Sequence, residues 1–452
     1  MQQRLQRHLL AQLVTLGDHN ITGLLCASGR QSLDWSSDYR MYSRQRVKPE
    51  RLFEQVRTSL LEQLPPGEPV VVAVDDTHIR KSGKKVAGAK YARDPLGPPF
   101  HTNFIWAQRF LQMSMGCGSP ESARMIPVGW QHAPTPKKPG SKASDEERKA
   151  YRKARREQSV GRVATAQLRQ TRTWLDRHGQ QKRKLWCVGD GGFTNGTVLK
   201  NLPENTVFLG RIRSDAKLHF LPQPPEGRKG RRPVYGEAAP TPEQLRQDES
   251  IPWKKISVWI GGNKHDLRVK TLGPLRWRAA GGGHNLKLIV IAPLCYRISK
   301  SGKHLYRKPA FLICTDPEAD IQDILQRYVM RWDIEVNFRD EKTLLGVGEA
   351  QVRDQHAVQN VTATAVAAYA LLLTAAQKSQ LGKQAFALPR PKWQRRKPHR
   401  ATTQSLVQQM RFELWGQAMS FSHFASKQCS TRSDENSIHN PYHAVMYSSR
   451  HS

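Results

Sequence analysis

Four carboxylates in three separate segments are the residues best suited to chemistry. Asp75 and Asp76 end the apolar run VVVAVDDT, Asp190 follows the apolar run LWCVG, and Glu335 lies in the charged segment RYVMRWDIEVNFRDEK. Three converging carboxylates repel one another unless cations lie among them, and hard oxygen ligands suit Mg²⁺ or Mn²⁺. Two such ions can activate a water or a hydroxyl on one side of a phosphorus and neutralise the leaving oxygen. The acids therefore predict two-metal chemistry on a phosphodiester.

The segment around Glu335 carries further polar groups at regular spacing. Tyr328, Arg331, Glu335 and Lys342 are separated by three, four and seven residues. On one continuous helix, at about 100° per residue, they lie within roughly a 60° arc and present their polar groups together. Taken alone, the pattern is also typical of a solvated helix face with ion pairs four residues apart. Two apolar residues of the segment are expected to turn toward the core: Ile334 and Phe338.

Apolar runs separated by turn residues predict an α/β fold that positions these groups. Strands are expected at 70–77, 103–115, 123–131, 184–189, 205–213 and 310–316. Long helices are expected at 144–178, 320–345 and 360–377, the first two with Ser144 and Asp320 as N-caps. Carboxylates at the ends of neighbouring strands and on a packed helix can converge on one point. Asp190, followed by glycine, also fits a simple turn aspartate.

The pattern changes along the chain and predicts five regions. They are a helical N-terminal region that fits either a reader of DNA ends or a cap on the core (1–67), the first part of a catalytic core (68–213), a β-rich insertion (214–308), the second part of the core (309–378) and a basic C-terminal region with a disordered tail (379–452).

The charge of the chain indicates its partner. Lys and Arg number 72 against 38 Asp and Glu among 452 residues, a formal net charge of +34, so a polyanion such as nucleic acid is expected to bind. No apolar run reaches the roughly 18 residues of a membrane span, which predicts no membrane partner. The six cysteines form no zinc or disulfide pattern. We expect a soluble, cytoplasmic protein.

Three motifs together resemble bacterial insertion-sequence transposases of the DDE type. The pattern Tyr-x2-Arg-x3-Glu-x6-Lys, met above, matches the Y-R-E-K signature of that family. AVDDT and VGDGGFTN resemble its first- and second-aspartate segments and occur in the same order, with a long β-rich stretch before the glutamate. The resemblance covers about residues 65–375 and implies a ribonuclease-H-like mixed sheet with flanking helices.

By this resemblance, Asp76, Asp190 and Glu335 would hold two Mg²⁺ or Mn²⁺ ions. The family's first ligand usually directly precedes the threonine, which favours Asp76 over Asp75. Neighbouring residues of a strand point to opposite faces, so only one of the two aspartates is expected to reach the metals.

The resemblance also implies DNA contacts. Arg331 and Tyr328 would hold the phosphate beside the scissile bond, and Lys342 would contact DNA near the element's tip. An aromatic residue in the insertion would stack on a flipped base, and Trp277 is the candidate. Trp253 and Trp259 also lie in the insertion, and a role in the core fits each of the three tryptophans. Two arginines that leave the strand at 205–213 are expected to follow the DNA: Arg211 and Arg213.

The function so implied is cut-and-paste DNA transposition, in the bacterial cytoplasm at the nucleoid. The partners would be double-stranded DNA, as terminal inverted repeats and target DNA, and a second copy of the chain in a homodimer, with cleavage reaching the second strand through a hairpin. Two other functions fit the sequence: a ribonuclease-H-like nuclease without strand transfer, and a domesticated DNA-binding protein that has lost catalysis.

Overall fold

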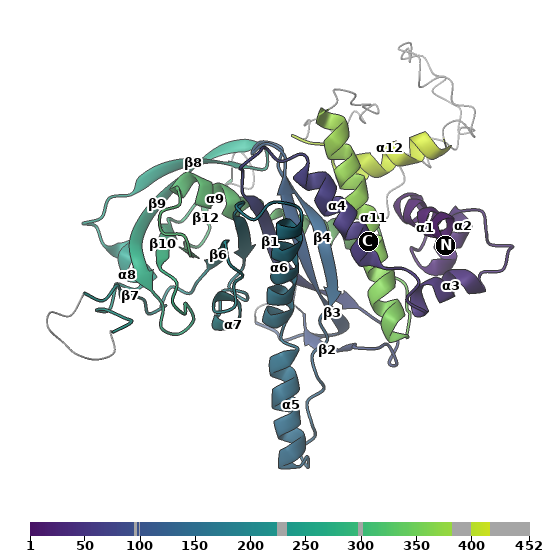
Figure 1. The fold of residues 1–452 in the computed structure, drawn as a ribbon, viewed down its shortest axis with the longest axis horizontal. Helices are drawn as coiled ribbons and strands as arrows, with labels where there is room; N and C mark the ends of the chain where they lie inside the picture. The colour runs from purple at the N-terminus through teal and green to yellow at the C-terminus, as the bar shows by residue number, and fades with distance from the viewer. Residues whose placement is uncertain (95–96, 99, 224–232, 297–301, 382–398, 416–452) are drawn as a thin grey trace, which may run out of the picture.

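The computed structural model describes residues 1–94, 97–98, 100–223, 233–296, 302–381 and 399–415. Over these residues, the chain is a mixed α/β protein in which helices flank one large sheet of parallel and antiparallel strands (Figure 1). Most of the basic stretch 388–400 and the tail 426–452 that the sequence predicts to be disordered lie outside the described residues.

The six strands predicted for the core are confirmed. They are β1 (Val70–Arg80), β3 (Phe104–Cys117), β4 (Arg124–His132), β5 (Leu185–Gly189), β6 (Thr206–Arg211) and β13 (Ala310–Cys314). Three antiparallel neighbours, β4, β3 and β1, are followed by β5 and β6, which run parallel to β1, and then by antiparallel β13. β1 does not stop at its two aspartates, because its pairing with β3 continues to Arg80.

The residues between β6 and β13 extend the same sheet. They form β7 (His219–Phe220), α8 (Pro242–Gln247), β8 (Lys254–Ile260), β9 (Asn263–Arg276), β10 (Leu286–Ile291), β11 (Cys295–Tyr296) and β12 (Leu305–Tyr306). β10 pairs with β13, β9 with β10, and both β7 and β8 with β9, while β11 pairs with β12. At the other end, β2 (Lys90–Arg93) is an edge strand beside β3.

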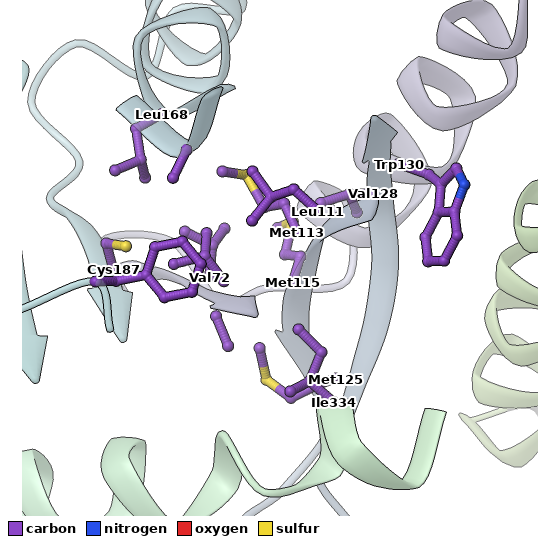
Figure 2. Packing of buried hydrophobic residues seen from close by; sticks show 14 of the residues in the cluster. Val72, Leu111, Met113, Met115, Met125, Val128, Trp130, Leu168, Cys187 and Ile334 are labelled. Carbon is purple, nitrogen blue, oxygen red and sulfur yellow. The ribbon is translucent and has the colours of Figure 1, made fainter. Parts of the chain in front are cut away.

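Helices cover both faces of the sheet. They are α1 (Gln2–Val14), α2 (Ile21–Ala27), α3 (Ser36–Ser43), α4 (Pro49–Leu61), α5 (Asp145–Glu157), α6 (Val160–Arg177), α7 (Gly196–Leu199), α9 (Ile321–Met330), α10 (Asp333–Thr343), α11 (Gln355–Leu381) and α12 (Thr403–Trp415). In Figure 2, Leu168 of α6 lies on one side of β3 and β4, and Ile334 of α10 lies on the other. The alternation of side chains along the strands thus supplies an apolar layer to each face.

α11 is long and apolar enough to cross a membrane, but it is a core helix here. Its apolar window is 83% buried, packed against β4, α4 and α1. Burial of this kind is typical of the central helix of a globular domain.

The helix predicted at 144–178 is two helices, so that prediction is wrong in its continuity. Ser144 does begin α5 with a capping box, but Ser159 adopts an extended backbone and separates α5 from α6. α6 has an apolar face that packs on the sheet, whereas α5 has no buried residue to hold it in line with the body. The periodicity of the charged residues did not reveal this change of environment.

Glu341 of α10 predicts how stability depends on pH. It is fully enclosed, and burial raises its pKa from 4.5 to about 8, partly opposed by the positive charge of Lys342. With its amide nitrogen turned toward Glu341, Gln112 donates to both carboxylate oxygens at 2.9 and 3.1 Å. The native state therefore holds a proton that the unfolded chain loses, and Glu341 destabilises the fold progressively as pH rises from about 4.5 to 8.

We expect Glu341→Gln to stabilise the protein at alkaline pH by roughly 1–3 kcal/mol and to change little at pH near 5. The glutamine keeps the volume and removes the charge. Chemical unfolding of both proteins at the two pH values measures this difference, and a difference independent of pH would contradict it.

Candidate active site

The pairing of β1 with β5 brings Asp75 and Asp190 together. Val74 pairs with Gly189 in the parallel register, so Asp75 and Asp190 are the next residues along neighbouring strands. On each strand, earlier side chains on the same face point toward α9. Val71 of β1 packs against an apolar cluster that contains Trp186 and Val188 of β5. The same cluster contains Ile324 and Leu325 of α9. Because side chains alternate along each strand, the two carboxylates point to this same face.

Asp76 points to the opposite face of the sheet. Arg109 of β3 holds its carboxylate with two hydrogen bonds, from Nε at 2.6 Å and from Nη2 at 2.7 Å. This bidentate pair uses both oxygens of Asp76. The sequence favours Asp76 as the first metal ligand, but the geometry of the strand supports its neighbour Asp75, which alone of the two lies beside Asp190.

Asp190 is both a turn residue and a neighbour of Asp75. Its Oδ1 accepts hydrogen bonds from the backbone N–H groups of Gly192 at 2.8 Å and Phe193 at 3.2 Å, as in an Asx turn. No hydrogen bond reaches Oδ2 within the described part of the chain. The turn therefore fixes the carboxylate in place while one oxygen still faces the site.

The helix predicted at 320–345 is also two helices, which corrects the single helix face expected from the spacing. Asp320 caps α9 as predicted, through Gln322 and Asp323. Between α9 and α10, four backbone bonds run three residues apart, including Arg331 N to Tyr328 O and Glu335 N to Trp332 O. These tighter turns place Arg331 in the break and Glu335 in the first turn of α10. As predicted, Ile334 and Phe338 are buried.

Arg331 joins the strand carboxylates to the helix carboxylate. Its Nη1 donates to Asp75 Oδ2 at 3.0 Å and its Nη2 donates to Glu335 Oε1 at 3.0 Å. The guanidinium is mostly buried, with 10% of its side chain exposed. Tyr328 lies within reach of the same charges, because Arg331, Asp190 and Glu335 all affect its hydroxyl. Asp75, Asp190, Tyr328, Arg331 and Glu335 thus form one cluster.

Positive charge stabilises the carboxylates of the cluster. Burial raises the pKa of Asp75 to about 7; Arg331 opposes this rise, and the charge of Asp190 adds to it. Burial alone would lower the pKa of Arg331, but Asp75 and Glu335 outweigh it and the pKa is raised. Burial raises the pKa of the Tyr328 hydroxyl. A second cation near Asp75 and Asp190 would therefore be bound favourably.

Lys342 lies apart from the cluster, farther along the same face of β1. Its Nζ donates to Thr77 Oγ1 at 2.7 Å, two residues beyond Asp75, and burial lowers its pKa. The four signature residues therefore do not lie on one helix: Tyr328 is on α9, Arg331 is in the break, and Glu335 and Lys342 are on α10.

A pocket of about 780 Å³ opens beside the Asp190 turn. Trp277, Arg211 and Arg213, the three DNA-contacting residues expected from the region after β5, all line it, together with Gly191 and Lys308. Of the other two tryptophans considered, Trp253 packs under the Lys270 ammonium 4.7 Å from its ring, and Trp259 is bound through its backbone by Gln326. Trp277 is thus the tryptophan of the three that reaches the site.

The donor set of the cluster fits hard divalent cations, but its carboxylates are not gathered into a formed metal site. No group of three or more His, Cys, Asp or Glu side chains is close enough to hold a metal among the residues that the structure describes. Arg331 lies between Asp75 and Glu335 and supplies the charge that a metal would supply. Carboxylate oxygens with a raised pKa beside a second carboxylate are suited to Mg²⁺ or Mn²⁺.

Sequence reasoning missed the residues that hold α10 in place. Arg400, just before α12, donates to Asp333 Oδ1 at 2.5 Å and to the carbonyl of Ala123. Asp333 Oδ2 accepts from the backbone of Met125 at 3.1 Å. Asp333 precedes Glu335 by two residues, so this bridge fixes the start of the helix that carries Glu335. The arginine lies in the basic C-terminal region, whose composition gives no sign of this contact.

We expect Arg400→Ala to lower the free energy of unfolding by about 1–3 kcal/mol, because it leaves the half-enclosed Asp333 and the Ala123 carbonyl without their donor. Lys255→Ala is the control: Lys255 is 71% exposed and its partner Asp266 is 44% exposed, so the loss of this surface ion pair should cost less than about 0.5 kcal/mol. Equal losses in denaturant titrations would contradict the bridge.

Comparison with known proteins identifies the family of the chain. No curated protein matches the chain. A family model, described as DDE superfamily endonuclease, matches residues 1–281. The matched residues include Asp75, Asp190 and Trp277, and they end before Glu335. Members of such a family are nucleases that act on DNA and generally use divalent metal ions. Since the match spans more than half of the chain, the protein belongs to the DDE superfamily endonucleases.

Proposed function

We propose that the protein is a DNA transposase that cuts DNA at the ends of a mobile element and joins those ends to new DNA. The observation that carries this proposal is the adjacency of Asp75 and Asp190 on β1 and β5, facing Glu335 across Arg331. The order β4-β3-β1-β5-β6, antiparallel and then parallel, is consistent with a ribonuclease-H-like core.

In this proposal, Asp75, Asp190 and Glu335 hold two Mg²⁺ or Mn²⁺ ions, and Asp76 supports β1 through Arg109. When bound, the ions supply an activated water or 3′-hydroxyl and neutralise the leaving oxygen of the phosphodiester. The protein holds Asp190 in its turn and Glu335 at the start of α10, so both carboxylates are positioned before DNA arrives.

Arg331 and Tyr328 are suited to hold the phosphate beside the scissile bond. A guanidinium binds phosphate through two parallel hydrogen bonds. Its present partners, Asp75 and Glu335, are the groups that a metal would neutralise, so binding of the metal would free Arg331 for the substrate. Lys342, beside Thr77, would contact DNA farther along the same face.

The pocket beside Asp190 is suited to an unpaired base. Trp277 offers a face for stacking. Arg211, Arg213 and Lys308 line the pocket together with two acids, Glu243 and Asp215, the second of which pairs with Arg213. Its volume of about 780 Å³ accommodates a nucleotide. This supports a route in which a base next to the cut is flipped out, as when a hairpin forms at the element end.

Joining two element ends to one target requires that both be held together, so we propose a homodimer assembled on terminal inverted repeats in the bacterial cytoplasm. A nuclease without strand transfer would use the same carboxylates and cut without joining. The two functions differ in whether products joined to target DNA appear.

We expect Asp75→Asn, Asp190→Asn and Glu335→Gln each to reduce metal-dependent cleavage at least about 100-fold, because each removes a negatively charged ligand. DNA binding should persist in all three. The assay uses a plasmid that carries the coding sequence with its chromosomal flanks, a second plasmid as target, and detection of both nicked and joined products.

Asp76→Asn is the matched control, one residue away on the opposite face, and should keep most of the activity. Loss of cleavage in Asp76→Asn with retention in Asp75→Asn would contradict the assignment of the first ligand. Cleavage by the wild type without joined products would instead support the nuclease.

Trp277→Ala should weaken cleavage of the second strand more than the first nick, because base stacking contributes about 1–3 kcal/mol. Trp277→Phe keeps an aromatic face and should restore most of the activity. Gel analysis of both strands measures the two steps, and equal effects of the two substitutions would exclude a stacking role.

A further inference from the structure

We propose that residues 134–157 form an arm that holds duplex DNA outside the catalytic cluster. The arm consists of the chain that leaves β4, residues 134–144, and the returning helix α5. In Figure 1, α5 continues beyond α6 and projects from the lower edge of the body. The proposal rests on the proposed function only in taking DNA as the substrate.

α5 is stabilised by its own residues, without support from the core. None of its side chains is buried. A helix of 13 residues is marginal alone in water. Ser144 and Glu147 form a reciprocal capping box, and Arg148 donates to the carbonyls of Ser141 at 2.8 Å and Ala143 at 3.2 Å. These local contacts maintain a helix about 20 Å long away from the body.

Four of the six basic residues of α5 lie on the side of the helix that faces away from the rest of the chain. At about 100° per residue, Lys149, Arg152, Lys153 and Arg156 lie within roughly a 100° arc. The opposite side carries the two half-buried residues of the helix, Tyr151 and Ala154. No ion pair involves the four basic side chains within the described ranges.

The arm begins next to the turn that carries Asp190. Gly161, in the first turn of α6, lies against α7: a Cβ placed there would be 3.5 Å from Thr197 and 3.6 Å from Val198. α7 starts at Gly196, six residues after Asp190. α5 therefore extends beyond the edge of the sheet at which Asp75 and Asp190 lie. A DNA duplex that runs from the carboxylate cluster past this edge would pass along α5.

A duplex fits this surface better than a protein partner does. Apart from Asp145 at its N-terminal end, the exposed face offers repeated cations and no apolar anchor, whereas protein interfaces depend on buried aromatic and apolar residues. Phosphates bind such a row of cations without regard to base sequence. The arm would thus add affinity and orient the DNA, while the cut site would be chosen elsewhere.

The test compares the wild type with the triple variant K149Q/R152Q/R156Q. Binding of a fluorescein-labelled duplex of random sequence is measured by anisotropy in EDTA, over a series of NaCl concentrations. We expect affinity to fall about tenfold or more, and the slope of log K against log salt to fall by about 0.9 for each phosphate that the arm no longer neutralises. The melting temperature should not change, because no side chain of α5 is buried.

K254Q/K255Q/K264Q is the matched control, with three exposed lysines of the β8–β9 hairpin neutralised. It should bind with nearly the wild-type salt dependence. If the arm variant keeps the wild-type slope, or if the control loses as much as the arm variant, the arm proposal is overturned and the proposed function stands. If the wild type does not bind duplex DNA at all, both fail.

Discussion

The repulsion between the carboxylates of Asp75 and Asp190 is the constraint on which the site depends. The parallel register of β1 and β5 forces them to adjacent positions on one face, where burial raises the pKa of Asp75 to about 7. Such a pair stays fully charged only with a compensating cation, since otherwise one carboxylate takes up a proton. In the structure, Arg331 supplies that charge and at the same time connects Asp75 to Glu335.

The rest of the fold holds this arrangement in place. α9 packs its apolar face on β5, β6 and β13, and the tight turns after it turn Arg331 inward and begin α10. Arg400 anchors the start of α10 through Asp333, although it lies beyond the part of the chain that the family model matches. The C-terminal segment is therefore a structural element of the site as well as a basic region.

The sequence predicts the strands well because β-branched runs bounded by turn residues have few other conformations. It also singles out the acids by their motifs, while the roles of the acids and of the residues that line the Trp277 pocket stay predictions. Two features depend on tertiary structure and could not be predicted. The choice between Asp75 and Asp76 depends on strand register and on Arg109, which lies 33 residues away. The breaks after residues 157 and 330 depend on which helix faces the sheet covers.

The continuation of the sheet through β10 and β9 is a third such feature. Alternating apolar residues indicated strands after residue 214, but the partner of each strand is set by contacts distant in sequence, such as Leu288 with Ile313. Trp277 follows β9, which belongs to the same sheet as β5, and so it lies near the Asp190 turn. This connection joins the proposed base pocket to the carboxylates.

Anomalous diffraction from crystals of the protein grown with Mn²⁺ tests most directly whether Asp75 and Asp190 hold a metal. We expect a peak within about 2.2 Å of carboxylate oxygens of both Asp75 and Asp190, with Arg331 displaced from Asp75. A peak at Asp76 instead, or no peak near Asp75 and Asp190 at saturating Mn²⁺, would contradict it.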